Sequence, residues 1–283
     1  MNFDLTEEQE MMRESFARLL DDTCTPARLR AAEKEGLDRA FWTELAELGA
    51  FLLRVPEASD GLGLGTFDAV ILMEEVGRKL PFGPIAETIL AAHLIAVLGN
   101  GQFTSQLSAV ISGEIIASIA FHDVEESPNQ FVAGGRDAEL VIAARGNDIV
   151  LFKVPETARP KAASLASDGL AQVEFASAEA SVLASGADAI SIFNAALEEW
   201  KILISAALAG LGRQALRMAS EYACERKQFD QQIGKFQAIS HPLADCLCSV
   251  DCGKLLTWKV IRAIADGDAG AGAGRDCLPA AWV

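Results

Sequence analysis

The spacing of apolar residues predicts helices in the first part of the chain. A capping box formed by Thr6 and Gln9 opens the first one, and apolar residues then recur at helical spacing: Met11, Met12, Phe16, Leu19 and Leu20. Further runs with the same period cover Ala40–Leu48, Thr66–Gly77 and Pro84–Leu98. The chain up to about Gly113 is therefore predicted to be helical.

The pattern then changes to short runs rich in Ile, Val, Ala and Phe, bounded by Gly, Asp, Asn and Pro. These runs are predicted strands, and they cover Glu114–Phe121, Leu140–Ala144, Ile149–Val154 and Ala171–Phe175. From about Ala187 the helical period returns and continues, with one interruption, to about Ala265. The order predicts an α+β multidomain protein: a helical domain over 1–113, a small β-domain over 114–186 and a helical domain over 187–283.

Composition and charge exclude several classes of function. The 283 residues carry a formal charge of −16, which disfavours nucleic acid and anionic membrane surfaces as partners. No run reaches the length of about 18 apolar residues that a membrane span needs. The first eight residues show neither the basic start nor the apolar middle of a secretory signal, so we expect a cytoplasmic protein with reduced cysteines.

The stretch from Glu225 to Asp245 joins two predicted helices through Arg226, Lys227 and a short turn. Such a turn can be a simple connection, in which an arginine at the helix C-terminus is favoured by the helix dipole. It can also bind an anion, because a guanidinium donates two parallel hydrogen bonds to a phosphate. The residues alone leave both interpretations open.

Three separated segments resemble the acyl-CoA dehydrogenase family, in the same order as in that family. They are Leu5-Thr6-Glu7-Glu8-Gln9, the loop Gly61-Leu62-Gly63-Leu64-Gly65 with Met73-Glu74-Glu75-Val76-Gly77-Arg78 after it, and Glu225-Arg226-Lys227-Gln228-Phe229 with Ile233, Phe236-Gln237-Ala238-Ile239 and Leu243-Ala244-Asp245. The resemblance covers most of the chain. It implies the fold of that family, with a helical N-terminal domain, a small β-domain and here an incomplete C-terminal helical bundle.

The resemblance also implies FAD as the cofactor, bound with the help of the turn of a neighbouring subunit. Arg226, Lys227 and Gln228 are implied to hold its pyrophosphate, and Phe236 and Gln237 are implied to lie near its adenosine end. Oxidation of an acyl-CoA at its α,β-bond, in fatty acid or steroid side-chain degradation, is the implied activity. An electron-transfer flavoprotein is the implied electron acceptor.

One departure from the family lies inside the turn, where members usually have Gly and this chain has Asp230. A carboxylate that faces solvent, or pairs with Lys227 or Lys235, leaves the site usable, whereas one that points inward repels the phosphates. A second departure lies in the strands. His122 stands at the Thr position of the family's Thr-Glu-Pro…Gly-Ser-Asp flavin loop, as a donor to the flavin ring or as a solvated or salt-bridged group. The later Trp-Ile-Thr strand has no counterpart.

A third departure concerns the general base. The chain stops at Val283, and we expect it to lack both a flavin-contacting Gln…Gly-Gly stretch and the glutamate that removes the α-proton in most members. Members that place this glutamate one helix earlier have it at the position of Trp200, by counting back from Arg226. Glu199 is adjacent, but one helical step turns a side chain by about 100°. We expect Glu199 to be a solvated acid at a helix start, and we assign no catalytic residue.

Two further positions are implied to bind substrate. Lys201 matches a position where relatives carry Arg near bound substrate, and Glu198 is assigned with it. No metal site is predicted, because Cys246, Cys248 and Cys252 are expected to be free thiols in a helical core.

The sequence leaves two classes of function open. The chain is either an acyl-CoA dehydrogenase in its own right or a non-catalytic subunit that supports a complete partner, and it can also be a fragment of a longer enzyme. In each case we expect a homo- or hetero-oligomer, because a chain ending at Val283 leaves apolar side chains partly uncovered. These side chains are Leu203, Leu208, Leu211, Leu255 and Ile261.

Overall fold

Residues 4–162 and 169–265 are described by the computed structural model. Backbone contacts group them into two units. Unit 1 holds residues 4–13, 70–80 and 201–265, and unit 2 holds 14–69, 81–162 and 169–200. The boundary runs through three helices: α1 (Glu7–Thr23), α4 (Thr66–Lys79) and α7 (Ala187–Glu225). The division into domains over 1–113, 114–186 and 187–283 stays a prediction.

The helices of unit 2 surround α5 (Ile85–Leu98), which is apolar on nearly all sides and almost wholly buried. The other helices that lie wholly in this unit are α2 (Pro26–Glu35), α3 (Arg39–Glu47) and α6 (Thr104–Ile111). Capping fixes two of their starts: Thr25 accepts a hydrogen bond from the amide of Arg28, and Asp38 accepts one from the amide of Phe41. The predicted helices are confirmed, while α2 and α6 are additional short helices.

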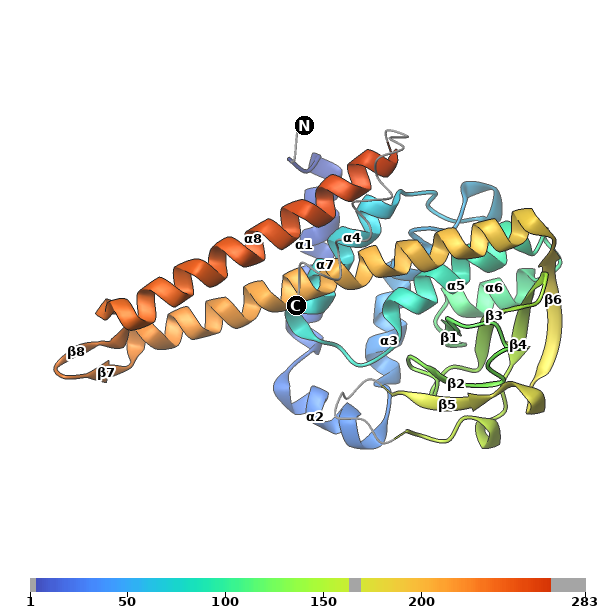
Figure 1. Ribbon diagram of the computed structural model, residues 1–283, viewed down its shortest axis with the longest axis horizontal. Helices are drawn as coiled ribbons and strands as arrows, with labels where there is room; N and C mark the ends of the chain where they lie inside the picture. Colours follow the sequence, from blue (N-terminus) through green and yellow to red (C-terminus); the bar gives the residue numbers. More distant parts are fainter. Residues whose placement is uncertain (1–3, 163–168, 266–283) are drawn as a thin grey trace. The chain divides into compact units, whose positions relative to one another are not determined.

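The strands of unit 2 form two small sheets (Figure 1). The larger has the order β1-β3-β4-β6, built from β1 (Ala117–Ile119), β3 (Leu140–Arg145), β4 (Asp148–Lys153) and β6 (Glu179–Ser185). Only β1 and β3 are parallel. The smaller pairs β2 (Asn129–Val132) with β5 (Ala171–Glu174). The four predicted strands are present, and β2 and β6 were missed because their exposed positions break the apolar run.

In unit 1, α4 crosses α7 with almost no space between the two backbones. A Cβ atom on Gly77 would lie 1.7 Å from the carbonyl oxygen of Ala207, and one on Gly210 would lie 1.9 Å from that of Glu74. Glycine is therefore required at both positions. The close approach also brings the side chains of α4 within reach of the last helix.

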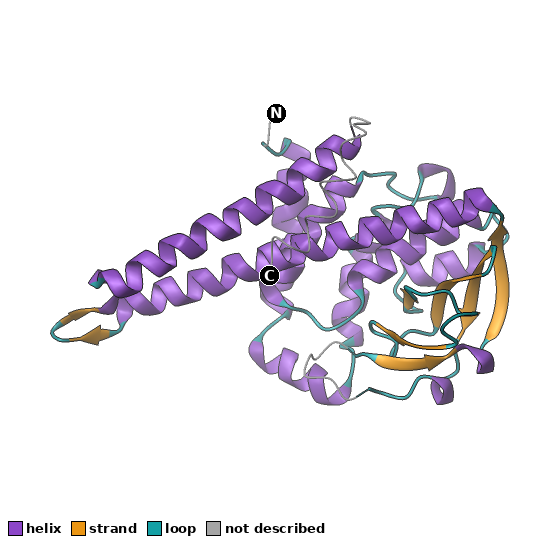
Figure 2. Ribbon diagram, viewed as in Figure 1, coloured by secondary structure: helices purple, strands orange, loops and turns teal. Residues whose placement is uncertain are grey.

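That last helix, α8 (Gln237–Ala265), follows α7 through a small hairpin of β7 (Lys227–Gln228) and β8 (Gln231–Gln232), drawn at one end of the two helices in Figure 2. The predicted C-terminal helical pair is thus present in the described chain. The expectations about the chain end, including the stretch from Asp266 to Val283, lie outside the described residues. No helix in 4–162 or 169–265 is both long and apolar enough to cross a membrane.

The prediction of uncovered apolar side chains on this pair was partly wrong. Leu203 and Ile261 are buried, since they face the core of unit 1, and Leu211 is half-buried. Leu208 and Leu255 are exposed, at 37% and 48% of their surface. The exposed apolar surface of unit 1 is therefore concentrated farther along the two helices and at the turn.

Candidate functional site

The loop that replaces the expected flavin loop follows β1 and is held by polar contacts with the backbone. Buried Gln130 of β2 accepts a hydrogen bond from the amide of His122 (3.0 Å) and donates to the carbonyl oxygens of His122 and Ser127. Asp123 accepts from the amides of Glu125 and Gly146. The ring of His122 is exposed, and both predicted alternatives, a donor to the flavin ring and a solvated group, stay predictions.

Trp200 lies against the start of this loop. Its ring centroid is 4.4 Å from that of Phe121, the residue before His122, with the two planes inclined at 50°. The indole Nε1 donates a hydrogen bond of 2.7 Å to Oε1 of Glu87, a buried carboxylate on α5. Three elements of unit 2, namely α5, the first part of α7 and the loop after β1, thus meet at Trp200.

Glu199 is not the solvated acid at a helix start that we expected. It lies well inside α7, its side chain is only 12% exposed, and both carboxylate oxygens accept from Arg54, at 2.6 and 3.0 Å. Arg54 also donates to the carbonyl oxygen of Leu64 in the glycine-rich loop. The expectation of a solvated Glu199 was wrong because its partner cation, Arg54, lies 145 positions earlier in the chain. Both oxygens of the Glu199 carboxylate are thus engaged by one guanidinium.

His93 of α5 completes this cluster through the backbone of Arg54. Its Nδ1 lies 2.8 Å from the carbonyl oxygen of Arg54, which can only accept, so Nδ1 carries the proton. Burial lowers the pKa of His93, and the charge of Arg54 lowers it further, against opposing effects of the backbone hydrogen bond and of Glu199. The ring is therefore neutral at physiological pH.

The two positions assigned to substrate lie on the same helix, three residues apart. Glu198 is half-buried and Lys201 is exposed, and both already interact with other groups of the protein. The backbone carbonyl of Lys201 accepts a hydrogen bond from the hydroxyl of Ser205. Their assignment to substrate stays a prediction.

The five residues assigned to the cofactor all lie at the turn between α7 and α8. Four of them are exposed, namely Arg226, Lys227, Gln228 and Gln237, and Phe236 is half-buried. Phe229 and Asp230 form the two-residue tip, with φ of +52° and +62°, and no ion pair joins Asp230 to Lys227 or Lys235 in the described chain. Asp230 is exposed, which is the solvent-facing alternative.

The chemistry of this donor set fits the pyrophosphate of a dinucleotide. Arg226 and Lys227 supply two cations, and Gln228 and Gln237 supply two amides, all from one turn. Phe229 is 88% exposed and meets Phe236 edge to face, with 6.1 Å between the ring centroids, so an aromatic surface lies beside the charges. Arg226 directly follows the last residue of α7, so the helix-dipole role and the role toward the cofactor both stay predictions.

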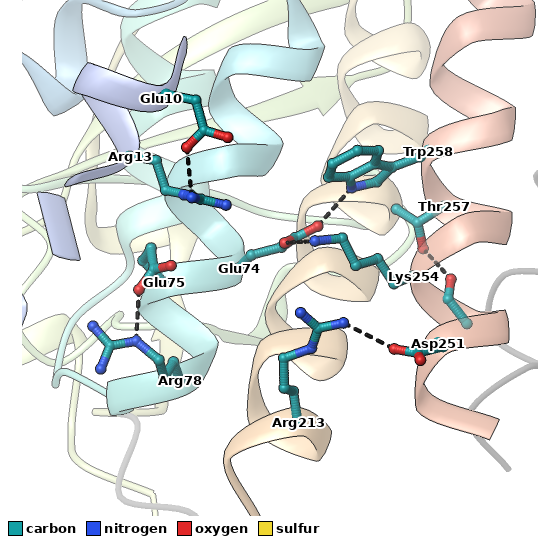
Figure 3. Close-up of polar contacts among 11 residues, drawn as sticks. Glu10, Arg13, Glu74, Glu75, Arg78, Arg213, Asp251, Lys254, Thr257 and Trp258 are labelled. Carbon is teal, nitrogen blue, oxygen red and sulfur yellow. Dashed lines mark hydrogen bonds and ion pairs between the residues drawn. The ribbon is translucent and has the colours of Figure 1, made fainter. Parts of the chain in front are cut away.

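Unit 1 contains a second tryptophan–glutamate pair, shown in Figure 3. Glu74 of α4 accepts 2.6 Å from Nε1 of Trp258 and 2.8 Å from Nζ of Lys254, and the Lys254 ammonium lies 4.3 Å from the centre of the Trp258 ring. Lys254 and Glu74 are 18% and 15% exposed. We call these three residues the α4–α8 clamp, because they join α4 to α8. The sequence placed Glu74 in a family motif but did not indicate its partners.

The cysteines of α7 and α8 differ from the expectation of a helical core. Cys224, Cys246, Cys248 and Cys252 are all free and exposed. The cause is that most side chains of the outer part of this helical pair are uncovered in the described chain. Among the residues described, no group of three or more His, Cys, Asp or Glu side chains is placed to hold a metal ion.

Family models match two parts of the chain. Residues 6–114 match the model described as acyl-CoA dehydrogenase, N-terminal domain, and residues 190–276 match acyl-CoA dehydrogenase, C-terminal domain. Between these ranges lie the two sheets of unit 2 and the loop after β1, where one of the departures from the family pattern is found.

Individual relatives and solved structures agree with the two family models. Acyl-CoA dehydrogenase IpdE2 of Mycolicibacterium smegmatis is 30% identical over 249 residues, which cover 87% of this chain and 74% of that protein. The ChsE4–ChsE5 complex of Mycobacterium tuberculosis shares the fold at 24% identity, with a TM-score of 0.83 over 97% of this chain and 82% of that one. PigA, solved with FAD and proline, has a TM-score of 0.80 at 18% identity, over 97% of this chain and 83% of that one. The chain therefore belongs to the acyl-CoA dehydrogenase family, whose cofactor is FAD, as the resemblance of its motifs implied.

Proposed function

We propose that the chain is a subunit of a mixed-oligomer acyl-CoA dehydrogenase in the cytoplasm, and that a partner subunit supplies the general base. The observation that carries the proposal is the pair Glu199 and Trp200. The position of the base is an indole, and the adjacent carboxylate is held in a two-point ion pair with Arg54. The indole nitrogen offers no free lone pair for a proton, and both oxygens of Glu199 are already bonded to Arg54.

In the proposed reaction a base removes a proton from the α-carbon of an acyl-CoA while a hydride leaves the β-carbon. Bound FAD supplies the acceptor for this hydride, and an electron-transfer flavoprotein then takes the electrons. In this scheme Arg226, Lys227 and Gln228 of the chain hold the pyrophosphate, and Phe236 and Gln237 bind toward the adenosine. Glu198 and Lys201 are proposed substrate contacts. Loss of the base alone lowers a rate by a factor of about 10²–10⁴, so the chain needs a partner to turn over.

The exposed apolar side chains of unit 1 support an oligomer. Five of them lie on the outer parts of α7 and α8 and at the turn between them: Met218, Tyr222, Phe229, Ile239 and Leu247, with exposures from 37% to 88%. Large exposed apolar patches usually mark interfaces. ChsE4–ChsE5, a complex with this fold, is consistent with a related subunit as the partner.

The proposal is tested with the purified chain, alone and with a candidate partner from the same family. We expect little or no visible flavin absorbance and no acyl-CoA-dependent dye reduction from the chain alone, and turnover only from the combination. Arg226→Leu should lower the FAD retained by the combination. Arg217→Leu, which removes an exposed arginine paired with Glu221, should not. A yellow chain that reduces dye by itself would overturn the proposal.

A further inference from the structure

A cleft of about 360 Å³ lies on the sheet β1-β3-β4-β6 of unit 2, beside the first turn of α6. Its floor is apolar, because Leu140 and Leu151 are 5% and 4% exposed and Ile115 is half-buried. Clefts that bind small molecules have volumes of about 300–1,000 Å³ and combine an apolar lining with a few polar groups. The cleft is therefore large enough for a small ligand, and none of the described residues that line it is a proposed contact of FAD or substrate.

Two opposite charges line this cleft. Lys153 of β4 and Glu179 of β6 are partners in the strand register, so their side chains start about 5 Å apart on the same face of the sheet. Leu140 of β3 is the partner of Lys153 on its other side. An apolar side chain, an ammonium and a carboxylate therefore lie in one row across three strands.

Both charges are accessible to a ligand. Lys153 and Glu179 are exposed, and no ion pair joins them in the described chain. They also line a neighbouring cleft of about 380 Å³, whose wall adds the guanidinium of Arg159 and the carboxylates of Glu139 and Glu156. Charges of both signs thus surround the Lys153–Glu179 pair. This arrangement favours neither a simple anion nor a simple cation, but a ligand that carries both charges.

We propose that this cleft binds a free aliphatic α-amino acid. The α-carboxylate binds the Lys153 ammonium, the α-ammonium binds the Glu179 carboxylate, and the aliphatic side chain lies on the apolar floor. One carbon separates the two charged groups of an α-amino acid, which matches two protein side chains that start about 5 Å apart. Ser105 and Gln106 of α6 and Ser181 of β6 also line the cleft, and they supply hydroxyl and amide groups for the remaining hydrogen bonds.

The test follows the methyl NMR signals of Ile115, Leu140 and Leu151 in the full chain during titration with L-leucine. We expect saturable shifts with a Kd on the order of 1 mM, the affinity that one buried leucine side chain and two exposed ion pairs can supply. Three probes each lack one group: 4-methylpentanoate lacks the ammonium, 3-methylbutylamine lacks the carboxylate and glycine lacks the side chain. The first two should bind about 5-fold more weakly than leucine, and glycine should bind about 10-fold more weakly or less well still.

Two variants assign each charge of the ligand to its partner. Lys153→Gln should weaken leucine binding by about 5-fold and should not weaken 3-methylbutylamine, whereas Glu179→Gln should weaken leucine and should not weaken 4-methylpentanoate. Lys161→Gln is the control, since Lys161 is an exposed lysine of unit 2 outside the lining of the cleft. Shifts that do not saturate, or that arise at residues other than those lining the cleft, would overturn the site, and variants that weaken all probes alike would overturn the assignment of the charges. The readout needs neither FAD nor turnover, so the site and the proposed subunit function can fail separately.

Discussion

Two tryptophans of this chain make the same bond in different surroundings. In the α4–α8 clamp, Trp258 and Lys254 lie one helical turn apart on α8 and both reach Glu74, so the carboxylate is neutralised and the ammonium also contacts the ring. In unit 2, Trp200 bonds to Glu87, while the cation near this turn of α7, Arg54, is bonded to Glu199 instead. The clamp joins two helices. The Trp200 cluster joins α7 to α5 and to the loop after β1.

The difference shows that the same contact is supported by a cation in one region and by a second aromatic ring in the other. Lys254 lies over the ring of Trp258 at cation–π distance, so each of the three clamp residues contacts the other two. Trp200 instead packs on Phe121 of a loop whose backbone is held by Gln130. We therefore expect the loss of an indole N–H to change the free energy of unfolding by different amounts in the two regions.

The largest effect is expected for Glu74→Leu. The variant leaves the Lys254 ammonium without its carboxylate, and the N–H of Trp258 without an acceptor, in a largely buried place. Loss of one partner of a buried pair costs about 3–5 kcal/mol. Urea unfolding measures the change, and Asp251→Ala is the control, since its exposed pair with Arg213 also joins α7 and α8 but should contribute at most about 1 kcal/mol. Equal losses from the two variants would show that the clamp does not hold α8.

A smaller effect separates the two tryptophans directly. Trp258→Phe and Trp200→Phe each remove the indole N–H and keep an aromatic ring, so each leaves a glutamate short of one donor. An unmet buried acceptor costs about 1–3 kcal/mol. We expect Trp200→Phe to lie near the upper end, because its acceptor Glu87 is 5% exposed, and Trp258→Phe near the lower end, because its acceptor Glu74 keeps the bond from Lys254. Denaturant midpoints give the comparison, and the reverse order would show that burial of the acceptor does not set the cost.

Substitution of Asp230, in the turn before α8, should change the free energy of unfolding still less. Asp230 has a φ of +62°, in a region that glycine adopts without strain, so Asp230→Gly should stabilise the chain by about 1 kcal/mol or less. Asp230→Asn is the control, since Asn tolerates this conformation about as well while it removes the charge. If the carboxylate weakens cofactor binding, both variants should retain more FAD with a partner, whereas a gain with Gly alone would assign the effect to backbone strain.

The smallest expected effect is a change in how steeply the free energy of unfolding depends on pH. The folded pKa of His93 lies below its ordinary value of 6.5, so the unfolded chain binds more protons just below that pH and stability falls as the pH falls through this window. Arg54 and Glu199 are the charged groups that act on the ring. His93→Gln should lose less stability than the wild type between about pH 7.5 and about pH 5.5. If the wild type and His93→Gln lose the same stability over this pH range, His93 is protonated to the same extent in the folded and the unfolded chain.

Local features were predictable because they depend on neighbours in sequence. The capping box forms as predicted, with Thr6 and Gln9 each accepting a hydrogen bond from the other's amide at 3.1 and 3.2 Å. The helical period of α5 and the strand runs of β3 and β4 gave their positions to within a few residues. The turn at Arg226 carries the family motif in consecutive residues, so the sequence was sufficient to identify the family and to propose the cofactor contacts.

Only the tertiary structure decided the partners of Glu199 and Trp200. Helical geometry predicts that adjacent residues point in different directions, as they do here, but not what each one meets. Arg54 lies 145 positions from Glu199, and Glu87 lies 113 positions from Trp200. Packing of α5, α7 and the glycine-rich loop brings these groups within hydrogen-bond distance. The sequence by itself determined the elements and the family, because local periodicity and motifs are written in neighbouring residues. Which carboxylate is neutralised, and which ring packs against the loop after β1, followed from contacts that arise only when distant segments fold against one another.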